Sequence, residues 1–208
     1  MAAKNPLPES PAGAPREKPH VCPWWLGYFL CCPLRRFVES PSRILAPYVR
    51  PGMTVLEPGC GMGWFTVEIA RRVGSEGRVV CADVQERMIR ALRRRVRRAG
   101  VADRVETILC PPASLGVDAW KDRIDLVVAI HVVHEVPDPA ALFREIRDAL
   151  RAGGRALMLE PRSHGHVTPE SFEATVAIAR TAGLREVERP SFRRSLAVLL
   201  EKPAAGAS

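Results

Sequence analysis

The chain has 208 residues, 47% of them hydrophobic and 26% charged, which is typical of a folded protein with one sizeable core. It carries no run of about 18 apolar residues and no apolar stretch of a secretory signal at its start, so we expect a cytoplasmic protein without a membrane span. The net charge of +8 comes largely from arginine, and the six cysteines follow no paired pattern, so we expect free thiols.

The beginning of the chain differs in composition from the rest. Residues 1–20 are rich in proline among small and charged residues, which predicts a disordered leader. Residues 21–50 begin with the aromatic and apolar stretch 24–32, and near-helical spacing after it predicts two short helices interrupted at Pro41. We expect residues 21–50 to form a lid or clamp, with a membrane-surface anchor as the alternative.

Strands and helices alternate after the turn at Pro51-Gly52. Apolar segments predict strands over residues 53–57, 78–83, 104–109, 124–130, 155–160, 184–189 and 195–200. Helical spacing and terminal signals predict helices over residues 64–73, 85–99, 139–150 and about 168–183. Such alternation predicts an α/β, Rossmann-like doubly wound sheet, mostly parallel, with helices on both faces. The last connection is too short for a crossover, so the last strand should run antiparallel to its neighbour.

A glycine loop, EPGCGMG at residues 57–63, directly follows the first strand and precedes a helix. Glycines in this context let the chain turn tightly and let a ligand touch the backbone. The dinucleotide fingerprint requires a further glycine where this chain has Trp64. The loop therefore indicates a nucleotide-like ligand and argues against a dehydrogenase.

Asp83 ends the second strand, about 20 residues beyond the glycine loop, where a carboxylate can accept hydrogen bonds from both hydroxyls of a ribose. The same side chain could instead cap the helix that begins near Gln85, and one residue can do both. Asp83 is consistent with any adenosine-containing cofactor.

Four segments in order resemble motifs of the class I S-adenosylmethionine-dependent methyltransferases: VLEPGCGMG (55–63), VCADV (80–84), DLVVAIH (125–131) and LRAGGR (150–155). The resemblance covers about residues 50–202. Within the family, the chain is similar to the small-molecule methyltransferases of quinone biosynthesis. The resemblance implies a seven-stranded sheet of order 3-2-1-4-5-7-6, a methyltransferase domain over residues 51–203, and S-adenosyl-L-methionine as methyl donor.

The resemblance also implies roles for individual residues. Glu57 and the glycine loop would hold the methionine portion, Asp83 the ribose and Val84 one face of adenine. Residues 109–114 contain no aspartate for the adenine amine, which leaves that contact to the backbone or to Ser114. The cofactor-binding residues implied are Glu57, Gly59, Cys60, Gly61, Gly63, Asp83, Val84, Ser114, Ile130 and His131.

Catalysis needs a base only where the acceptor must lose a proton before it attacks the methyl group. By position, the candidate catalytic residues are His131 and His134, with Glu135 beside them. Alternatively, His134 and Glu135 hydrogen-bond the loop before the next helix. His131, His134, His164 and His166 lack the spacing of a metal-ligand set, so we predict no metal.

The acceptor itself is open, and we expect a small molecule. A metalloid acceptor is an alternative suggested by Cys22, Cys31 and Cys32, because arsenic methyltransferases use cysteines. The spacing of these cysteines matches no defined pattern. A non-catalytic or RNA-binding protein that uses the basic Arg93 to Arg98 face is the alternative function. Nucleic acid is not favoured, because Met88, Ile89, Leu92 and Val96 predict an ordinary amphipathic helix with a solvated basic face.

Overall fold

The computed structural model describes residues 40–111, 113–162 and 167–204. The predicted leader, residues 1–20, and the aromatic stretch 24–32 lie outside these ranges. The expected lid or clamp is therefore described only from Ser40 onward, and Pro41 occupies the first turn of the helix α3 (Pro41–Leu45). A proline is favoured there because its missing N–H has no partner within the helix.

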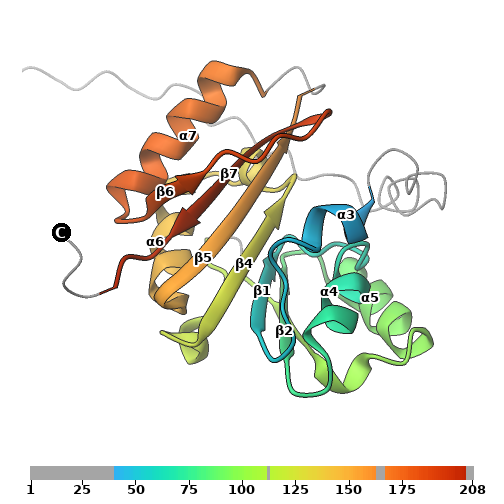
Figure 1. Cartoon of the computed structure of the whole chain (residues 1–208). Coiled ribbons are helices and arrows are strands. Elements are labelled where there is room, and N and C mark those ends of the chain that lie inside the picture. The colour runs from blue at the N-terminus through green and yellow to red at the C-terminus, as the bar shows by residue number, and fades with distance from the viewer. Residues whose placement is uncertain (1–39, 112, 163–166, 205–208) are drawn as a thin grey trace, which may run out of the picture.

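One sheet of seven strands forms the centre of the structure (Figure 1), in the order β3-β2-β1-β4-β5-β7-β6. The first five strands pair in parallel, and β7 is antiparallel to both β5 and β6. This confirms the predicted fold class and the reversed last strand. The strands are β1 (Thr54–Pro58), β2 (Arg78–Asp83), β3 (Val105–Leu109), β4 (Ile124–Ile130), β5 (Leu150–Pro161), β6 (Arg185–Glu188) and β7 (Ser195–Glu201).

Helices cover both faces of the sheet (Figure 1). On one face α3, α4 (Thr66–Val73) and α5 (Glu86–Arg98) bury apolar side chains in one core cluster, and on the other face α6 (Pro139–Ala149) and α7 (Pro169–Thr181) contribute to a second. Strand side chains alternate between the clusters: Val55 packs in the first and Leu56 in the second. Three 3-10 turns complete the described elements: η1 (Ala102–Arg104), η2 (Asp118–Trp120) and η3 (Val133–Glu135).

The fifth strand departs from its predicted bounds. We expected it over residues 155–160 after a glycine turn, but β5 already begins at Leu150. Leu150 pairs with Ile124 and Arg155 with Leu126, so the intervening residues form an irregularity inside the strand. Gly154 is required there because a Cβ would lie 2.9 Å from the carbonyl oxygen of Ile124. The glycines therefore accommodate a bulge where the pattern suggested a turn.

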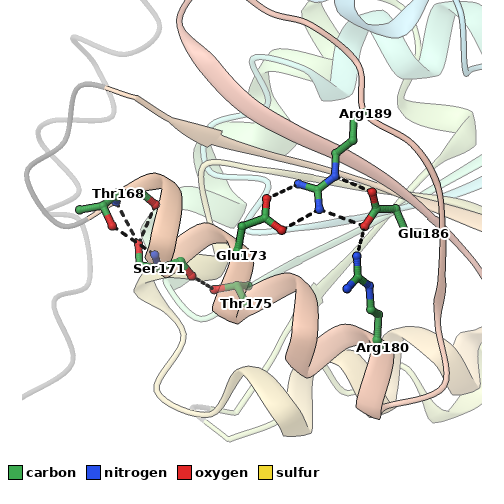
Figure 2. Close-up of polar contacts among 7 residues, drawn as sticks. All are labelled: Thr168, Ser171, Glu173, Thr175, Arg180, Glu186 and Arg189. Atoms are coloured by element: carbon green, nitrogen blue, oxygen red, sulfur yellow. Dashed lines mark hydrogen bonds and ion pairs between the residues drawn. The ribbon is translucent and has the colours of Figure 1, made fainter.

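Polar contacts fix the start of the helix α7 and join the helix to the segment around β6 (Figure 2). Thr168 and Ser171 form a reciprocal capping box, with the Ser171 N–H donating to Thr168 Oγ1 at 3.1 Å. Arg189, just after β6, makes two contacts each with Glu173 and Glu186, at 2.6–2.9 Å. Its guanidinium also lies 5.7 Å from the centroid of the Phe172 ring. These contacts join α7 to the edge of the sheet.

We expect Arg189→Met to lower the free energy of unfolding by about 1 kcal/mol, because it removes two bidentate ion pairs that remain partly exposed to water. Urea denaturation followed by circular dichroism measures the change. Arg94→Met, on the exposed face of α5, is the matched control and should leave the unfolding midpoint unchanged. Equal midpoints for the two variants would contradict a stabilising role for Arg189.

Among the residues that the structure describes, no helix is long and apolar enough to cross a membrane.

Candidate active site

The predicted site residues gather where the strand order reverses. Strand β1 lies between β2 and β4, and later strands are added on both sides of it. The strand order therefore reverses beside β1, and the loop after β1 lies at that point. Ligands of open α/β sheets bind at such a switch point. The glycine loop follows β1, Asp83 ends β2, and His131 follows β4. The fold thus brings together segments that are up to about 70 residues apart.

The three glycines of the loop have different structural requirements, although all three have positive φ. A Cβ at Gly59 would lie 2.4 Å from Val132 Cγ2, and one at Gly63 would lie 2.3 Å from Leu92 Cδ1. At Gly61 (φ +52°), no atom lies within 4 Å of the Cβ position. Gly59 and Gly63 therefore permit close packing, whereas Gly61 borders open space above the loop. Cys60, between them, is buried and is a free thiol.

Asp83 connects the glycine loop to the start of α5. Its Oδ2 accepts a hydrogen bond from the Gly61 N–H at 2.9 Å, and its Oδ1 accepts one from the Gln85 N–H at 2.8 Å. The carboxylate is only 8% exposed, and this burial raises its pKa while the two backbone hydrogen bonds lower it. Each carboxylate oxygen can accept more than one hydrogen bond. Asp83 therefore holds the N–H of Gln85, which is itself the N-cap residue of α5, and is not the cap that we weighed for that helix. Its oxygens retain acceptor capacity for ribose hydroxyls.

Glu57 is buried between β1 and α4. The Thr66 hydroxyl donates to its Oε2 at 2.5 Å, and the Cys81 thiol lies 3.7 Å from the same oxygen. Burial raises the pKa of Glu57 to about 7; the Thr66 and Cys81 contacts lower it and the Asp83 charge raises it. A nearby cation would favour the ionised form, as would be expected from the ammonium group of a methionine portion.

The ends of β2 and β3 expose two apolar side chains beside the glycine loop. Val84 is 44% exposed and Leu109 is 52% exposed, and Leu109 is paired in register with Asp83. Exposed apolar side chains next to a polar nucleotide-type loop suit the faces of an adenine ring. We had not predicted Leu109; the available signal was an apolar residue at the last position of a strand.

Ser114 is held by α6. Its hydroxyl donates to Glu145 Oε2 at 3.0 Å and accepts a hydrogen bond from the Gly116 N–H at 2.9 Å. The Leu115 N–H donates to the same carboxylate oxygen at 2.8 Å. These contacts attach the loop after β3 to α6, so the contact of Ser114 with adenine stays a prediction.

His131 stands at the carboxyl end of β4 in a left-handed backbone conformation, with φ +56°, which is uncommon for any residue but glycine. Its N–H donates to the Leu159 carbonyl at 2.8 Å, and its Nε2 lies 3.4 Å from Ser195 Oγ. Ile130, the preceding residue, is half-buried against the core beneath α4 and α5. The turn directs the chain across the end of β5.

His134 pairs with Glu160, a carboxylate at the end of β5 that we had not predicted. His134 Nδ1 is hydrogen-bonded with Glu160 Oε2, and the Val133 N–H donates to Glu160 Oε1 at 2.8 Å. Glu160 is 2% exposed, and its contact with the imidazole raises the pKa of His134. The sequence signal was a single carboxylate directly after the apolar run of residues 156–159.

The described part of the chain contains no cluster of three His, Cys, Asp or Glu side chains that could hold a metal ion. His164 and His166 lie outside those residues, as do Cys22, Cys31 and Cys32. On α5, the predicted apolar stripe is buried, namely Met88, Ile89, Leu92 and Val96. Six arginines of that helix are exposed: Arg87, Arg90, Arg93, Arg94, Arg97 and Arg98.

Several known proteins similar to this chain are named methyltransferases. The ubiquinone/menaquinone biosynthesis C-methyltransferase of Idiomarina loihiensis is 33% identical over 112 residues, which cover 54% of this chain and 44% of that protein. The chain thus matches less than half the length of this curated relative. A solved S-adenosylmethionine-dependent methyltransferase from Aquifex aeolicus has a TM-score of 0.78 at 22% identity, and the match covers 86% of this chain and 98% of the other.

A second solved structure, an arsenic(III) S-adenosylmethionine methyltransferase from Chlamydomonas reinhardtii, has a TM-score of 0.60 at 19% identity, and the match covers 75% of this chain and 65% of the other. At these identities the solved structures support the fold alone. A family model described as "Methyltransferase domain" matches residues 50–187. That match covers more than half of the chain, so the chain belongs to this methyltransferase family and, with its motifs and sheet order, to the class I S-adenosylmethionine-dependent methyltransferases.

Proposed function

We propose that this chain transfers a methyl group from S-adenosylmethionine to a small organic acceptor. The observation that carries the proposal is the hydrogen bond from the Gly61 N–H to Asp83. It joins the loop that borders open space to the carboxylate that suits a ribose, at the switch point of the sheet. A purely structural turn would not require a buried carboxylate at this position.

The residues of the site fit the parts of the cofactor. Asp83 can accept the ribose hydroxyls, Val84 and Leu109 can flank adenine, and Glu57 can balance the ammonium charge. When bound, the sulfonium supplies an already activated methyl group. The protein then has to align the acceptor and exclude water. Residues 21–50 remain our proposed lid or clamp, and the disordered leader and the cytoplasmic location remain proposals as well.

The acceptor class is suggested by the curated relatives, whose names place them in ubiquinone and menaquinone biosynthesis as C-methyltransferases. The match covers only 54% of this chain and 44% of the relative. A quinone-like aromatic acceptor is therefore a proposal for this chain. The exposed arginines of α5 favour one second candidate, a non-catalytic protein that binds RNA. A salt-dependent gel shift lost on replacing Arg93 to Arg98, but kept in Asp83→Asn, would support that candidate.

Isothermal titration with S-adenosylmethionine and with S-adenosylhomocysteine tests the cofactor site. We expect binding by the wild-type chain and about 30-fold weaker binding by Asp83→Asn, because a loss of about 2 kcal/mol is typical for hydrogen bonds to a charged group. The asparagine also keeps one acceptor oxygen for the two N–H groups that Asp83 now serves. Asp118→Asn, at the exposed start of η2, is the matched control. Absence of binding by the wild-type chain would contradict the proposed function.

A further inference from the structure

The pair formed by His134 and Glu160 lies directly against the glycine loop. Val132 packs on Gly59, the next residue donates its N–H to Glu160, and the one after places its imidazole on the same carboxylate. The segment from His131 to Glu135 is therefore held between the cofactor loop on one side and the end of β5 on the other. The segment lies at the carboxyl ends of the strands, which is the edge of the sheet at which an acceptor would approach.

The burial of the Glu160 carboxylate is energetically unfavourable by itself. Glu160 follows the apolar run of residues 157–159 in the centre of the sheet and is 2% exposed. A buried carboxylate is tolerated only where hydrogen bonds or a counter-charge compensate for its lost hydration. Val133 N–H supplies one such bond, and the His134 ring supplies the other. A neutral side chain could anchor the same loop at lower cost, so the negative charge calls for a further role.

The contact also determines which nitrogen of His134 carries the lone pair. A neutral imidazole that donates Nδ1–H to Glu160 has its acceptor lone pair on Nε2. The acidic groups that act on this ring are Glu160 from β5 and Glu135 from η3, whose Oε1 lies 3.9 Å from Nε2. Both favour the protonated ring, which makes His134 a stronger proton acceptor than an isolated histidine.

We propose that Glu160 is a positioning residue that orients His134 as the general base of methyl transfer, and that the acceptor is a weak acid such as a phenol or hydroquinone. This inference rests on the proposed function. His134 Nε2 takes the hydroxyl proton, and the electron pair released onto the oxygen, or onto a conjugated ring carbon, forms the bond to the methyl carbon. The carbon–sulfur bond breaks with its pair on sulfur, leaving S-adenosylhomocysteine. A methylated ring carbon then loses its own proton to solvent.

The experiment measures S-adenosylhomocysteine formation from pH 5 to 9 under anaerobic conditions, with 1,4-dihydroxynaphthalene as probe and its dimethyl ether as the probe without a hydroxyl proton. We expect the wild-type rate on the hydroquinone to rise with pH through one titration above the ordinary range of histidine, and no transfer to the ether. Glu160→Gln should lower the midpoint by about one pH unit and kcat at least tenfold, with KM for the cofactor unchanged. Glu160→Asp should restore the wild-type midpoint, and Glu201→Gln, at the opposite end of the sheet, should behave as wild type.

A second variant and a second measurement guard against loss of structure in Glu160→Gln. His134→Asn should bind S-adenosylhomocysteine normally and lose the pH-dependent limb of the rate. Nitrogen-15 NMR of the His134 ring should report the Nδ1–H tautomer in the wild type and a lower titration midpoint in Glu160→Gln. An unchanged midpoint in Glu160→Gln, equal rates on the two probes, or no transfer to the hydroquinone while S-adenosylhomocysteine still binds would overturn the inference. Failure of the wild-type chain to bind the cofactor would instead overturn the proposed function.

Discussion

Gly61→Ala is expected to weaken S-adenosylmethionine binding by about 100-fold, equivalent to about 2.7 kcal/mol, while the chain stays folded. No atom lies within 4 Å of the Cβ position at this glycine, so a methyl group would occupy the open space above the loop without meeting the protein. The positive φ of Gly61 adds a strain of about 1–2 kcal/mol in any other residue. Isothermal titration and urea unfolding measure the two effects separately.

Gly59→Ala, in contrast, should mainly lower the stability of the fold. Its Cβ would lie 2.4 Å from Val132 Cγ2, and Val132 is a stiff, β-branched side chain packed against the core. We expect the free energy of unfolding to fall by about 3 kcal/mol or more, from overpacking and backbone strain together. Gly100→Ala is the matched control for both variants, because Gly100 has φ +69° and open space but lies at the end of α5. If Gly61→Ala bound the cofactor as well as Gly100→Ala does, the open space above the loop would not be the cofactor site.

Glu57→Gln is expected to stabilise the cofactor-free chain and to weaken cofactor binding. Burial raises the pKa of Glu57 to about 7, against an ordinary value of 4.5. The folded chain therefore binds this proton more tightly than the unfolded chain, so stability falls as pH rises from about 4.5 to about 7 and stays low above that range. Removing the charge should recover up to about 3 kcal/mol at pH 8. Urea unfolding at pH 5 and pH 8 measures the difference.

The same carboxylate should make cofactor binding depend on pH. The ammonium group of the methionine portion favours ionised Glu57, so binding releases a proton wherever the free site is protonated. We expect the affinity for S-adenosylmethionine to rise about 20-fold between pH 5.5 and pH 7.5 in the wild-type chain, and to vary little in Glu57→Gln. Glu76→Gln, in the exposed turn before β2, serves as control. A wild-type affinity independent of pH would show that Glu57 does not sense the bound cofactor.

Local pattern was a reliable guide wherever one segment carried its own signal. The bounds of β2 and β4 agree with the predicted ranges, because both strands are short, mainly apolar runs. The start of α7 agrees because Thr168 and Pro169 form a local helix-start signal. The predicted start of β5 was wrong. The irregularity at the start of this strand depends on pairing with Ile124, which no pattern within residues 150–155 encodes.

The candidate site divides in the same way. From the sequence alone came the glycine loop, the carboxylate Asp83 and, through the resemblance, the cofactor and the strand order that the structure confirms. These features are local motifs, and their chemistry follows from residue type and spacing. Only the tertiary structure decided that Glu57 is buried against Thr66, that Ser114 is held by Glu145, and that His134 meets Glu160. Burial and pairing of charges depend on which distant segments the sheet brings together, and that proximity sets both the ionisation and the orientation of the side chains.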